Sequence, residues 1–141
     1  MKNKFVVLIA VIAISLSSNC QSVTPPAAVK TAFKTKYPKA TNIKWGKENA
    51  KEYEAEFKLN GTSVSANFGL DGSWVETETV MKTADLPAPV TAAVKKKYPD
   101  AAITLAEKLE MPGDKLLYEV SFKAGGKKKS MELNPDGSMA K

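Results

Sequence analysis

The chain switches between two spacings of hydrophobic and polar residues, and it does so twice. Residues 28–37 carry apolar side chains at helical spacing, and farther on every second residue is apolar, as in Tyr53, Ala55, Phe57 and Leu59. Residues 90–98 repeat the helical spacing, and residues 118–122 repeat the alternation. Each half is therefore predicted to form a helix that is followed by β-strands, with one apolar face on each element.

The ends of the predicted helices are marked by proline. Each helix should end at or before a tyrosine, Tyr37 or Tyr98, because a residue that precedes proline avoids the helical region. Thr24 is expected to cap the first helix, with Pro25 at its first position. Asp85 is expected to cap the second helix, although Pro87 follows it two residues later and not directly.

Glycine-containing pairs mark the predicted turns. Asn60-Gly61 is a strong hairpin signal, and Gly125-Gly126 takes the corresponding place in the second half. Asp71-Gly72 separates the third strand from a fourth one at residues 73–80. Only four residues follow Asp136-Gly137, so the fourth strand of the second half should be absent or vestigial.

The two halves are also similar in amino-acid sequence. VKTAFKTKYPKA at residues 29–40 and VTAAVKKKYPDA at residues 90–101 are identical at seven of twelve positions, at an offset of 61. The offset is 65 between the two Asp-Gly-Ser turns at 71–73 and 136–138, which places a four-residue insertion near residues 111–114. An offset that changes once and then holds indicates a duplication.

The predicted fold class is α+β: a tandem repeat of a helix followed by antiparallel strands, with the last strand of the second unit truncated. The helices should lie on one face of the sheet and leave a polar face free. Edge strands that meet at the boundary between the units would remove two exposed edges.

The domain boundaries follow from the repeat and from the start of the chain. We expect a signal peptide at 1–19, a short linker at 20–24, a first repeat at 25–83 and a second at 84–141. Lys2 and Lys4 precede an apolar run at residues 5–16, which is too short to span a membrane and is typical of a secretory signal. No other segment is apolar enough to span.

Export leaves open the fate of Cys20, the single cysteine. Either its thiol is lipidated after cleavage, or ordinary cleavage occurs near Ser18 or Ser22; Asn19 before the cysteine fits a lipidation signal poorly. The expected location is the periplasm, or the outer membrane through a lipid on Cys20, which would be the sole membrane contact.

Composition narrows the chemistry. The 141 residues carry a net charge of +6, with lysine as the only strong base and no arginine or histidine. Because the chain has no arginine, which nucleic-acid-binding proteins use for bidentate contacts, nucleic acid is a poor candidate partner. Because it has no histidine, catalysis by an imidazole and a histidine-bound zinc are both excluded. Lys127, Lys128 and Lys129 can form a charged loop or edge strand, or can meet an anionic surface.

Carboxylates are the remaining candidates for catalysis. Glu54 and Glu56 lie two residues apart on one strand, so they should point side by side from the wet face and not across a cleft, as glycoside hydrolysis requires. The Asp-Gly-Ser segments are predicted to be tight turns because they lack the ligand spacing of a calcium loop. We therefore predict no catalytic residue, no metal and no cofactor.

The ordered motifs resemble a known family. Pro-x-x-Val, the Tyr-Pro-x-Ala helix exit, Trp45, Tyr-Glu-x-x-Phe and Asp-Gly-Ser are similar to the PepSY-like domains that share the fold of the secreted β-lactamase inhibitor protein. The resemblance covers residues 25–141 and implies tandem units on a curved sheet, in exported proteins of Bacteroidetes-type envelopes that mostly have no established activity. Ala106 stands where Trp45 would align in the second unit, which puts in doubt whether both units share one binding role.

These observations favour an exported, non-enzymatic binding module, whose partner is an unidentified envelope protein and which can inhibit or regulate a hydrolase. Trp45 should be core, whereas Trp74 fits either the core or an exposed anchor. The alternatives are a sensor of small molecules or anionic lipid or glycan and, third, a carboxylate hydrolase. The candidate partner-binding residues are Trp74, Tyr53, Glu54, Glu56, Lys58 and Lys123.

Overall fold

The structure, a computed structural model, describes residues 23–140 and has the predicted α+β architecture. Two helices pack on a single antiparallel sheet of seven strands, and the strands lie side by side in chain order. The elements are α1 (Ala27–Lys36), β1 (Thr41–Lys47), β2 (Glu52–Leu59), β3 (Thr62–Gly69), β4 (Trp74–Met81), the 3₁₀ turn η1 (Thr83–Asp85), α2 (Ala88–Lys97), β5 (Ala102–Met111), β6 (Lys115–Ala124) and β7 (Lys127–Leu133).

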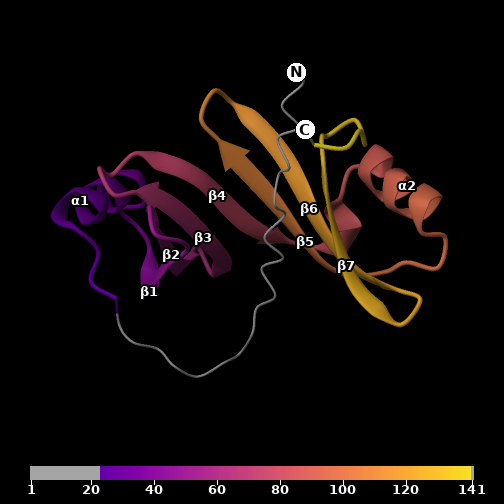
Figure 1. Cartoon of the computed structure of the whole chain (residues 1–141), viewed down its shortest axis with the longest axis horizontal. Coiled ribbons are helices and arrows are strands. Elements are labelled where there is room, and N and C mark those ends of the chain that lie inside the picture. The colour runs from indigo at the N-terminus through magenta and orange to yellow at the C-terminus, as the bar shows by residue number, and fades with distance from the viewer. Residues whose placement is uncertain (1–22, 141) are drawn as a thin grey trace, which may run out of the picture.

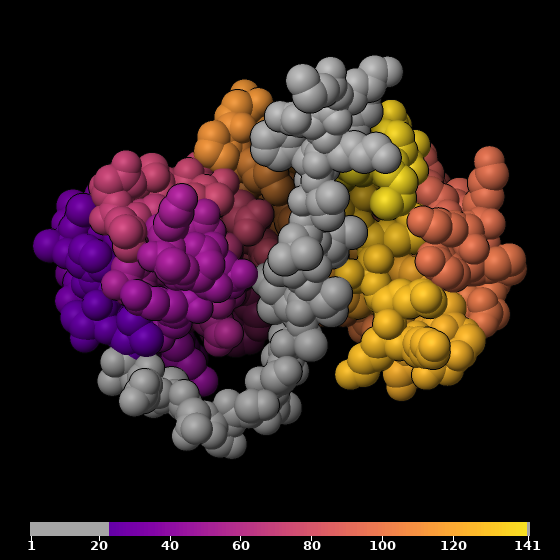
Figure 2. Space-filling view, viewed as in Figure 1, coloured from indigo at the N-terminus to yellow at the C-terminus, as the bar shows by residue number. Residues whose placement is uncertain are grey.

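The two units share this sheet through their boundary strands. β4 pairs with β5 from Thr77 opposite Glu110 to Met81 opposite Ala106, so the predicted meeting of edge strands is confirmed. The register carries one face through both units, since Thr77 and Met81 lie on the same side of β4. Helix α1 covers that face at one end of the molecule and α2 at the other (Figure 1). The first unit, indigo to magenta, and the second, orange to yellow, form the two ends of an elongated surface (Figure 2).

Each helix covers its own hydrophobic core. In the first unit, Phe33 of α1 is 2% exposed and its ring lies against four other aromatic rings. In the second unit, Val90 and Val94 of α2 are fully buried against strands β5 to β7. The first core comprises Val29, Phe33, Tyr37, Tyr53, Ala55, Phe57, Val64, Ala66 and Phe68, and the second Leu86, Val90, Val94, Ala101, Ala106, Val120, Phe122, Ala124, Met131 and Leu133.

The helix ends agree with the predictions, but the helix starts do not. Tyr37 and Tyr98 follow the last helical residues, and each donates its backbone N–H to the carbonyl four residues earlier. Thr24 and Asp85 cap neither helix: the N-cap residues are Pro26 and Pro87, without a side-chain hydrogen bond. A proline lacks the N–H and holds its φ near −65°, so it can precede a helix without a capping side chain.

The turns have the predicted conformations. Asn60 and Gly61 both have positive φ, as a two-residue hairpin between right-twisted strands requires. Gly72 has φ +86° and Gly137 has φ +83°. In both Asp-Gly-Ser turns the serine N–H donates to the aspartate carboxylate at 2.9 Å. These equivalent turns support the duplication that the sequence indicated.

Three large apolar side chains are exposed among the described residues. Leu70 is 50% exposed, because β3 ends at Gly69 and the alternation stops there. Ile43 is 44% exposed and lies on the edge strand β1, where the pairing with β2 is irregular between Thr41 and Lys44. Met139 forms only an isolated bridge with Leu133, which is the vestigial last strand of the second unit.

Candidate functional site

The candidate site is the face of the sheet that neither helix covers, which we call the open face. Side chains alternate along a strand, so those next to the core residues of β2 to β7 point to this face. On β2, for example, Tyr53, Ala55 and Phe57 point to the helix side, and Glu54 and Glu56 point to the open face.

Glutamates gather on the open face. Glu56 lies opposite Ser65, and Ser65 lies opposite Glu78, so these three form one row across β2, β3 and β4. A second row crosses β5, β6 and β7, where carboxylates follow one another without a spacer. Apart from Glu52, the first residue of β2, seven glutamates point to the open face, and we call these seven the acidic set: Glu54, Glu56, Glu76, Glu78, Glu107, Glu119 and Glu132.

The helices have the opposite charge. Their exposed side chains include lysines of both units, namely Lys30, Lys34, Lys36, Lys95, Lys96 and Lys97. A chain of net charge +6 therefore divides its charge between a basic helix side and an acidic open face.

Burial raises the pKa values of five members of the acidic set, and repulsion by neighbouring carboxylates adds to the effect at four of them. The five are Glu54, Glu76, Glu78, Glu119 and, through burial alone, Glu107. Burial, and secondarily the neighbouring carboxylates, raise the pKa of Glu78 to about 8. The pKa values of Glu54 and Glu119 are raised to about 7, again chiefly by burial. Within residues 23–140 the one ion pair is Lys108–Glu110, at 3.1 Å, so none of the acidic set has a salt-bridge partner there.

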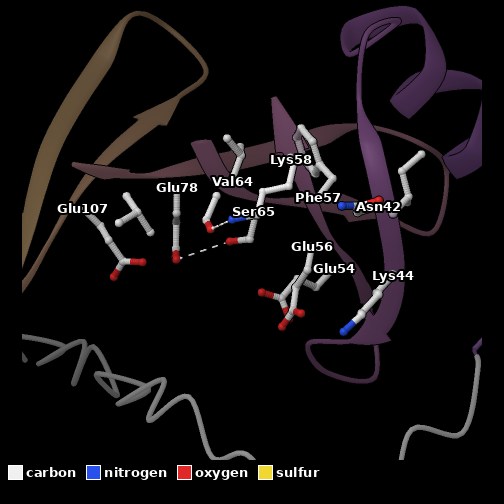
Figure 3. A pocket seen from close by; sticks show the side chains of 13 residues that line it. Asn42, Lys44, Glu54, Glu56, Phe57, Lys58, Val64, Ser65, Glu78 and Glu107 are labelled. Carbon is white, nitrogen blue, oxygen red and sulfur yellow. Dashed lines mark hydrogen bonds between the residues drawn. The ribbon is translucent and has the colours of Figure 1, made fainter. Parts of the chain in front are cut away.

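A hollow of about 640 Å³ lies in the open face of the first unit. Glu54, Glu56, Glu78 and Glu107 line it with their carboxylates, and Ser65 donates to Glu78 at 3.4 Å (Figure 3). Of its apolar lining residues, Ile43 and Val80 lie outside the cores, whereas Phe57 and Val64 belong to the first core; Lys44 and Lys58 also line the hollow. The hollow thus combines four carboxylates with two lysines and little apolar side-chain surface.

Asn67 of β3 has an unsatisfied acceptor on the open face, although it does not line the hollow. It pairs across the sheet with Glu54 on one side and Glu76 on the other, and the residue is 4% exposed. Its Nδ2 donates to Glu76 Oε1 at 3.0 Å, but its buried Oδ1 has no hydrogen-bond partner. Such groups are rare in folded proteins and cost free energy.

The predicted partner-binding residues divide into three groups. Glu54, Glu56 and Lys58 are on the open face around the hollow, where Lys58 Nζ donates to Ser63 Oγ at 2.6 Å. Lys123 is exposed on the same face but at the far end of β6, opposite Lys128. The third group comprises the two aromatic candidates.

Both aromatic candidates lie on the helix side and not on the open face. Tyr53 is 9% exposed and belongs to the first core, because it shares the parity of Ala55. Trp74 is half-buried: its Nε1 donates to Thr77 Oγ1 at 2.9 Å, and Lys36 Nζ lies 3.5 Å from the ring centroid. Neither is therefore available as an anchor on the open face. Trp45 packs on Phe33 at 5.1 Å, as its predicted core position requires.

Five of the seven open-face glutamates were not selected from the sequence. A usable signal was present, because Glu76 and Glu78 alternate with threonines on β4, and Glu119 alternates with core residues on β6. The pairing of β4 with β5, which brings Glu107 beside Glu78, depends on tertiary structure.

Other features of the described residues bear on metal binding, on membrane spans and on the predicted lysine cluster. Between residues 23 and 140 no three acidic, histidine or cysteine side chains converge as metal ligands. None of the helices described there combines the length and apolarity that crossing a bilayer requires. The lysines at 127–129 begin the edge strand β7, one of their predicted forms. Cys20 and the predicted signal peptide lie outside the described residues.

The raised pKa values predict an unusual dependence of stability on pH. Because the folded protein holds these protons where the unfolded chain has released them, the free energy of unfolding falls as the pH rises from about 4.5 to about 8. We expect Tm to be lower at pH 8 than at pH 5 by roughly 10 °C, measured by circular dichroism.

The variant Glu78→Gln should reduce this dependence. It removes a buried charge, so at pH 8 it should stabilise the fold by about 2 kcal/mol and change little at pH 5. The matched control is Glu110→Gln, which affects an exposed carboxylate paired with Lys108 and should keep the wild-type slope. A wild-type Tm that rises from pH 5 to pH 8 would contradict the prediction.

Comparisons with known proteins bear on this geometry. A family model described as "Putative beta-lactamase-inhibitor-like, PepSY-like" matches residues 18–63 and 51–140. A BLIP-like protein from Bacteroides fragilis has a similar structure with a TM-score of 0.70, at 26% identity over 84% of this chain and 85% of its own. A DUF2874 family protein from Bacteroides ovatus gives 0.73, at 26% identity over 84% and 86%.

A "putative periplasmic" protein from Bacteroides eggerthii has the same fold, with a TM-score of 0.75 and 23% identity over 84% of this chain and 88% of its own. A search of curated proteins found no match. The two matched segments overlap and together span residues 18–140, well over half of the sequence. The chain belongs to the PepSY-like, β-lactamase-inhibitor-like family.

Proposed function

We propose that this protein is an exported, non-enzymatic module that binds a protein of the cell envelope through the open face of its sheet. The observation that carries the proposal is the placement of both helices on one side, which leaves the other face of the seven-stranded sheet, where the acidic set lies, without a covering helix. That face holds seven carboxylates without a salt-bridge partner in the described chain. Charged faces of this kind steer and select a partner of opposite charge.

The proposed role is inhibition or regulation of an envelope hydrolase. The family description and the BLIP-like relative from Bacteroides fragilis, 26% identical, support a role of this class. Export is supported by the sequence of residues 1–19 and by the periplasmic description of one structural relative. We include in the proposal that a lipid on Cys20 can hold the module at the outer membrane.

The test is affinity capture with two charge-reversed variants. Tagged residues 22–141 are incubated with a native envelope extract in moderate salt, and bound proteins are identified by mass spectrometry. The double variant Glu56→Lys, Glu107→Lys changes two open-face positions, the exposed Glu56 and the half-buried Glu107. The matched control is Lys34→Glu, Lys96→Glu, which reverses two exposed charges on the helices.

We expect one protein to be retained by the wild type and the helix control and to be lost with the open-face variant. Its affinity should fall at least about 10-fold, because like charges would then face each other across the interface. Retention by the open-face variant with loss from the helix control would overturn the proposal. If salt-eluted anionic lipid or glycan were then the bound material, the lysine-rich helix side would be the binding surface of a sensor.

A further inference from the structure

We propose that the outer edge of β1, with the groove beside it, binds an extended acidic segment of a second partner protein, which pairs with β1 as an added strand. The inference goes beyond the proposed function, because this groove is on the helix side of the sheet and not on the open face. Three observations carry it: an unpaired strand edge, the strand that fills the equivalent place in the second unit, and the lysines around the groove.

β1 is an edge strand of the sheet. Within residues 23–140 its only neighbouring strand is β2, so the N–H and C=O groups on the other side of β1 have no strand to pair with there. A groove of about 420 Å³, which we call the edge groove, lies between β1 and α1. Its lining includes Lys30, Phe33 and Lys34 of α1 and Ile43 and Trp45 of β1. An added strand can therefore form main-chain hydrogen bonds with β1 and direct a side chain into the edge groove.

The second unit shows what occupies the equivalent place. At the repeat offset of 61, Trp45 of β1 corresponds to Ala106 of β5. Each lies opposite a core residue of the next strand, Ala55 and Val120, and these are 65 residues apart, as the duplication requires. The other edge of β5 is paired with β4, whose Met81 lies opposite Ala106 and packs against the second core. The edge beside Trp45 is thus equivalent to one that a strand with an apolar side chain covers.

The linker of the chain is too short to supply such a strand. β4 precedes α2 and pairs with β5 through five residues, 77–81. At the offset of 61 these correspond to residues 16–20, which lie outside the described residues and include the predicted cleavage site after residue 19. Cleavage there would leave only residues 20–22 ahead of the described chain. The added strand would therefore come from another protein.

Charge indicates the chemistry of that strand. Lys30 and Lys34 line the edge groove, and no acidic residue does. β1 contributes the exposed Lys44 and Lys47 and likewise has no acidic residue. Lysines on an edge strand disfavour pairing with another lysine-rich edge, such as β7 of a second copy, and attract carboxylates. An acidic segment with an apolar side chain for the edge groove fits this surface best.

The experiment is an NMR titration of labelled residues 22–141 at pH 7 with the peptide acetyl-Thr-Glu-Val-Met-Glu-Thr-amide. Antiparallel pairing, as between β4 and β5, would place its methionine beside Trp45 and its glutamates beside Lys44 and Lys47. We expect shifts at the β1 amides and at the Trp45 indole N–H, with a Kd on the order of 1 mM. Glutamine in place of both glutamates, or alanine in place of methionine, should each weaken binding at least about 5-fold.

Backbone methylation tests whether the peptide binds as a strand. In an added edge strand, the N–H groups of alternate residues point to β1, and those of the intervening residues point to solvent. Of two peptides that are N-methylated at alternate or at intervening residues, one should lose at least about 10-fold in affinity and the other should bind nearly as the parent does. Equal binding or equal loss by the two would overturn the inference.

Two pairs of substitutions test the position of the site. Lys44→Gln, Lys47→Gln removes both charges of β1 and should weaken the parent peptide at least about 5-fold. The matched control is Lys127→Gln, Lys128→Gln, which removes two exposed charges from the other edge strand and should bind as the wild type does. Loss with the control and not with the β1 variant would place the peptide on β7 and overturn the inference.

Other outcomes are equally decisive. Undiminished binding of the glutamine peptide, shifts confined to the open face, or no binding at several millimolar would each overturn the inference. If residues 20–141 with Cys20→Ser do not bind the peptide, the linker occupies the edge groove and the inference falls as well. The titration uses a synthetic peptide on the helix side, so its failure leaves the capture experiment with Glu56 and Glu107 as a separate test of the proposed function.

Discussion

Replacing Phe33 with alanine is expected to lower the free energy of unfolding by about 4 kcal/mol, the largest effect of a single side chain in this fold. Phe33 is 2% exposed, and its ring centroid lies 5.0–6.1 Å from those of Tyr37, Trp45, Phe57 and Phe68. Alanine removes these contacts and leaves a cavity that the strands cannot close, because the sheet register holds them. Thermal unfolding followed by circular dichroism should show Tm lower by about 15 °C.

A smaller substitution tests whether the loss of stability follows the size of the cavity. Phe33→Leu keeps most of the volume and should cost about 1.5 kcal/mol. Because β4 and β5 join both units in one sheet, the alanine variant should still unfold in a single transition. A second transition that retains the wild-type Tm would show that the units unfold independently and that the shared sheet does not couple them.

The second large effect is expected from Gly137→Ala, at about 3 kcal/mol. Gly137 has φ +83°, and a Cβ built there would lie 2.5 Å from the Pro89 carbonyl oxygen of α2. The substitution thus combines left-handed backbone strain of about 1–2 kcal/mol with a contact that forces the turn away from the helix. Denaturant unfolding should show a lower midpoint with an unchanged slope.

Gly126 separates the two causes. It has φ +73°, but nothing lies within 4 Å of a Cβ built there, so Gly126→Ala should cost only about 1 kcal/mol. Gly72→Ala should resemble Gly137→Ala, since its Cβ would lie 2.8 Å from the Ala28 carbonyl oxygen. Equal losses for Gly126→Ala and Gly137→Ala would mean that φ alone matters and that the turn does not rest on the helix.

These contacts explain why the same phrases occur twice in the sequence. In each unit the Asp-Gly-Ser turn presses on the first turn of its helix, at Ala28 in α1 and at Pro89 in α2. Those two helix positions differ by 61 residues and the two glycines by 65, the offsets that mark the duplication. The helix, the strands and the closing turn therefore form one packing unit, which is retained as a whole.

The division of charge also connects stability with function. Glu54, Glu78 and Glu119 destabilise the folded protein as the pH rises, because burial and repulsion by neighbouring carboxylates raise their pKa values. A basic partner that covers the open face would relieve this repulsion. The charges of this face therefore lower the stability of the free protein, and the partner that we propose would offset that cost.

The amino-acid sequence by itself determined the units and their elements. Helix ends before Tyr37 and Tyr98, the Asn60-Gly61 hairpin and the alternating strands follow from local backbone sterics and from the period of the apolar residues. The repeat is evident from the amino-acid identities, and the family followed from the order of the motifs. The helix ends, turns and strands depend on interactions between residues that are close in the sequence, so the sequence alone is enough to predict them.

The tertiary structure decided which of those side chains form a site. Tyr53 and Trp74 have aromatic rings suited to an interface, but the register of β2 turns Tyr53 into the core, and α1 covers Trp74 through Lys36. The pairing of β4 with β5 brings Glu78 and Glu107 from separate units to the same hollow. Register and strand order are long-range quantities, set by the packing of two helices on one shared sheet, so no local pattern in the sequence could show them.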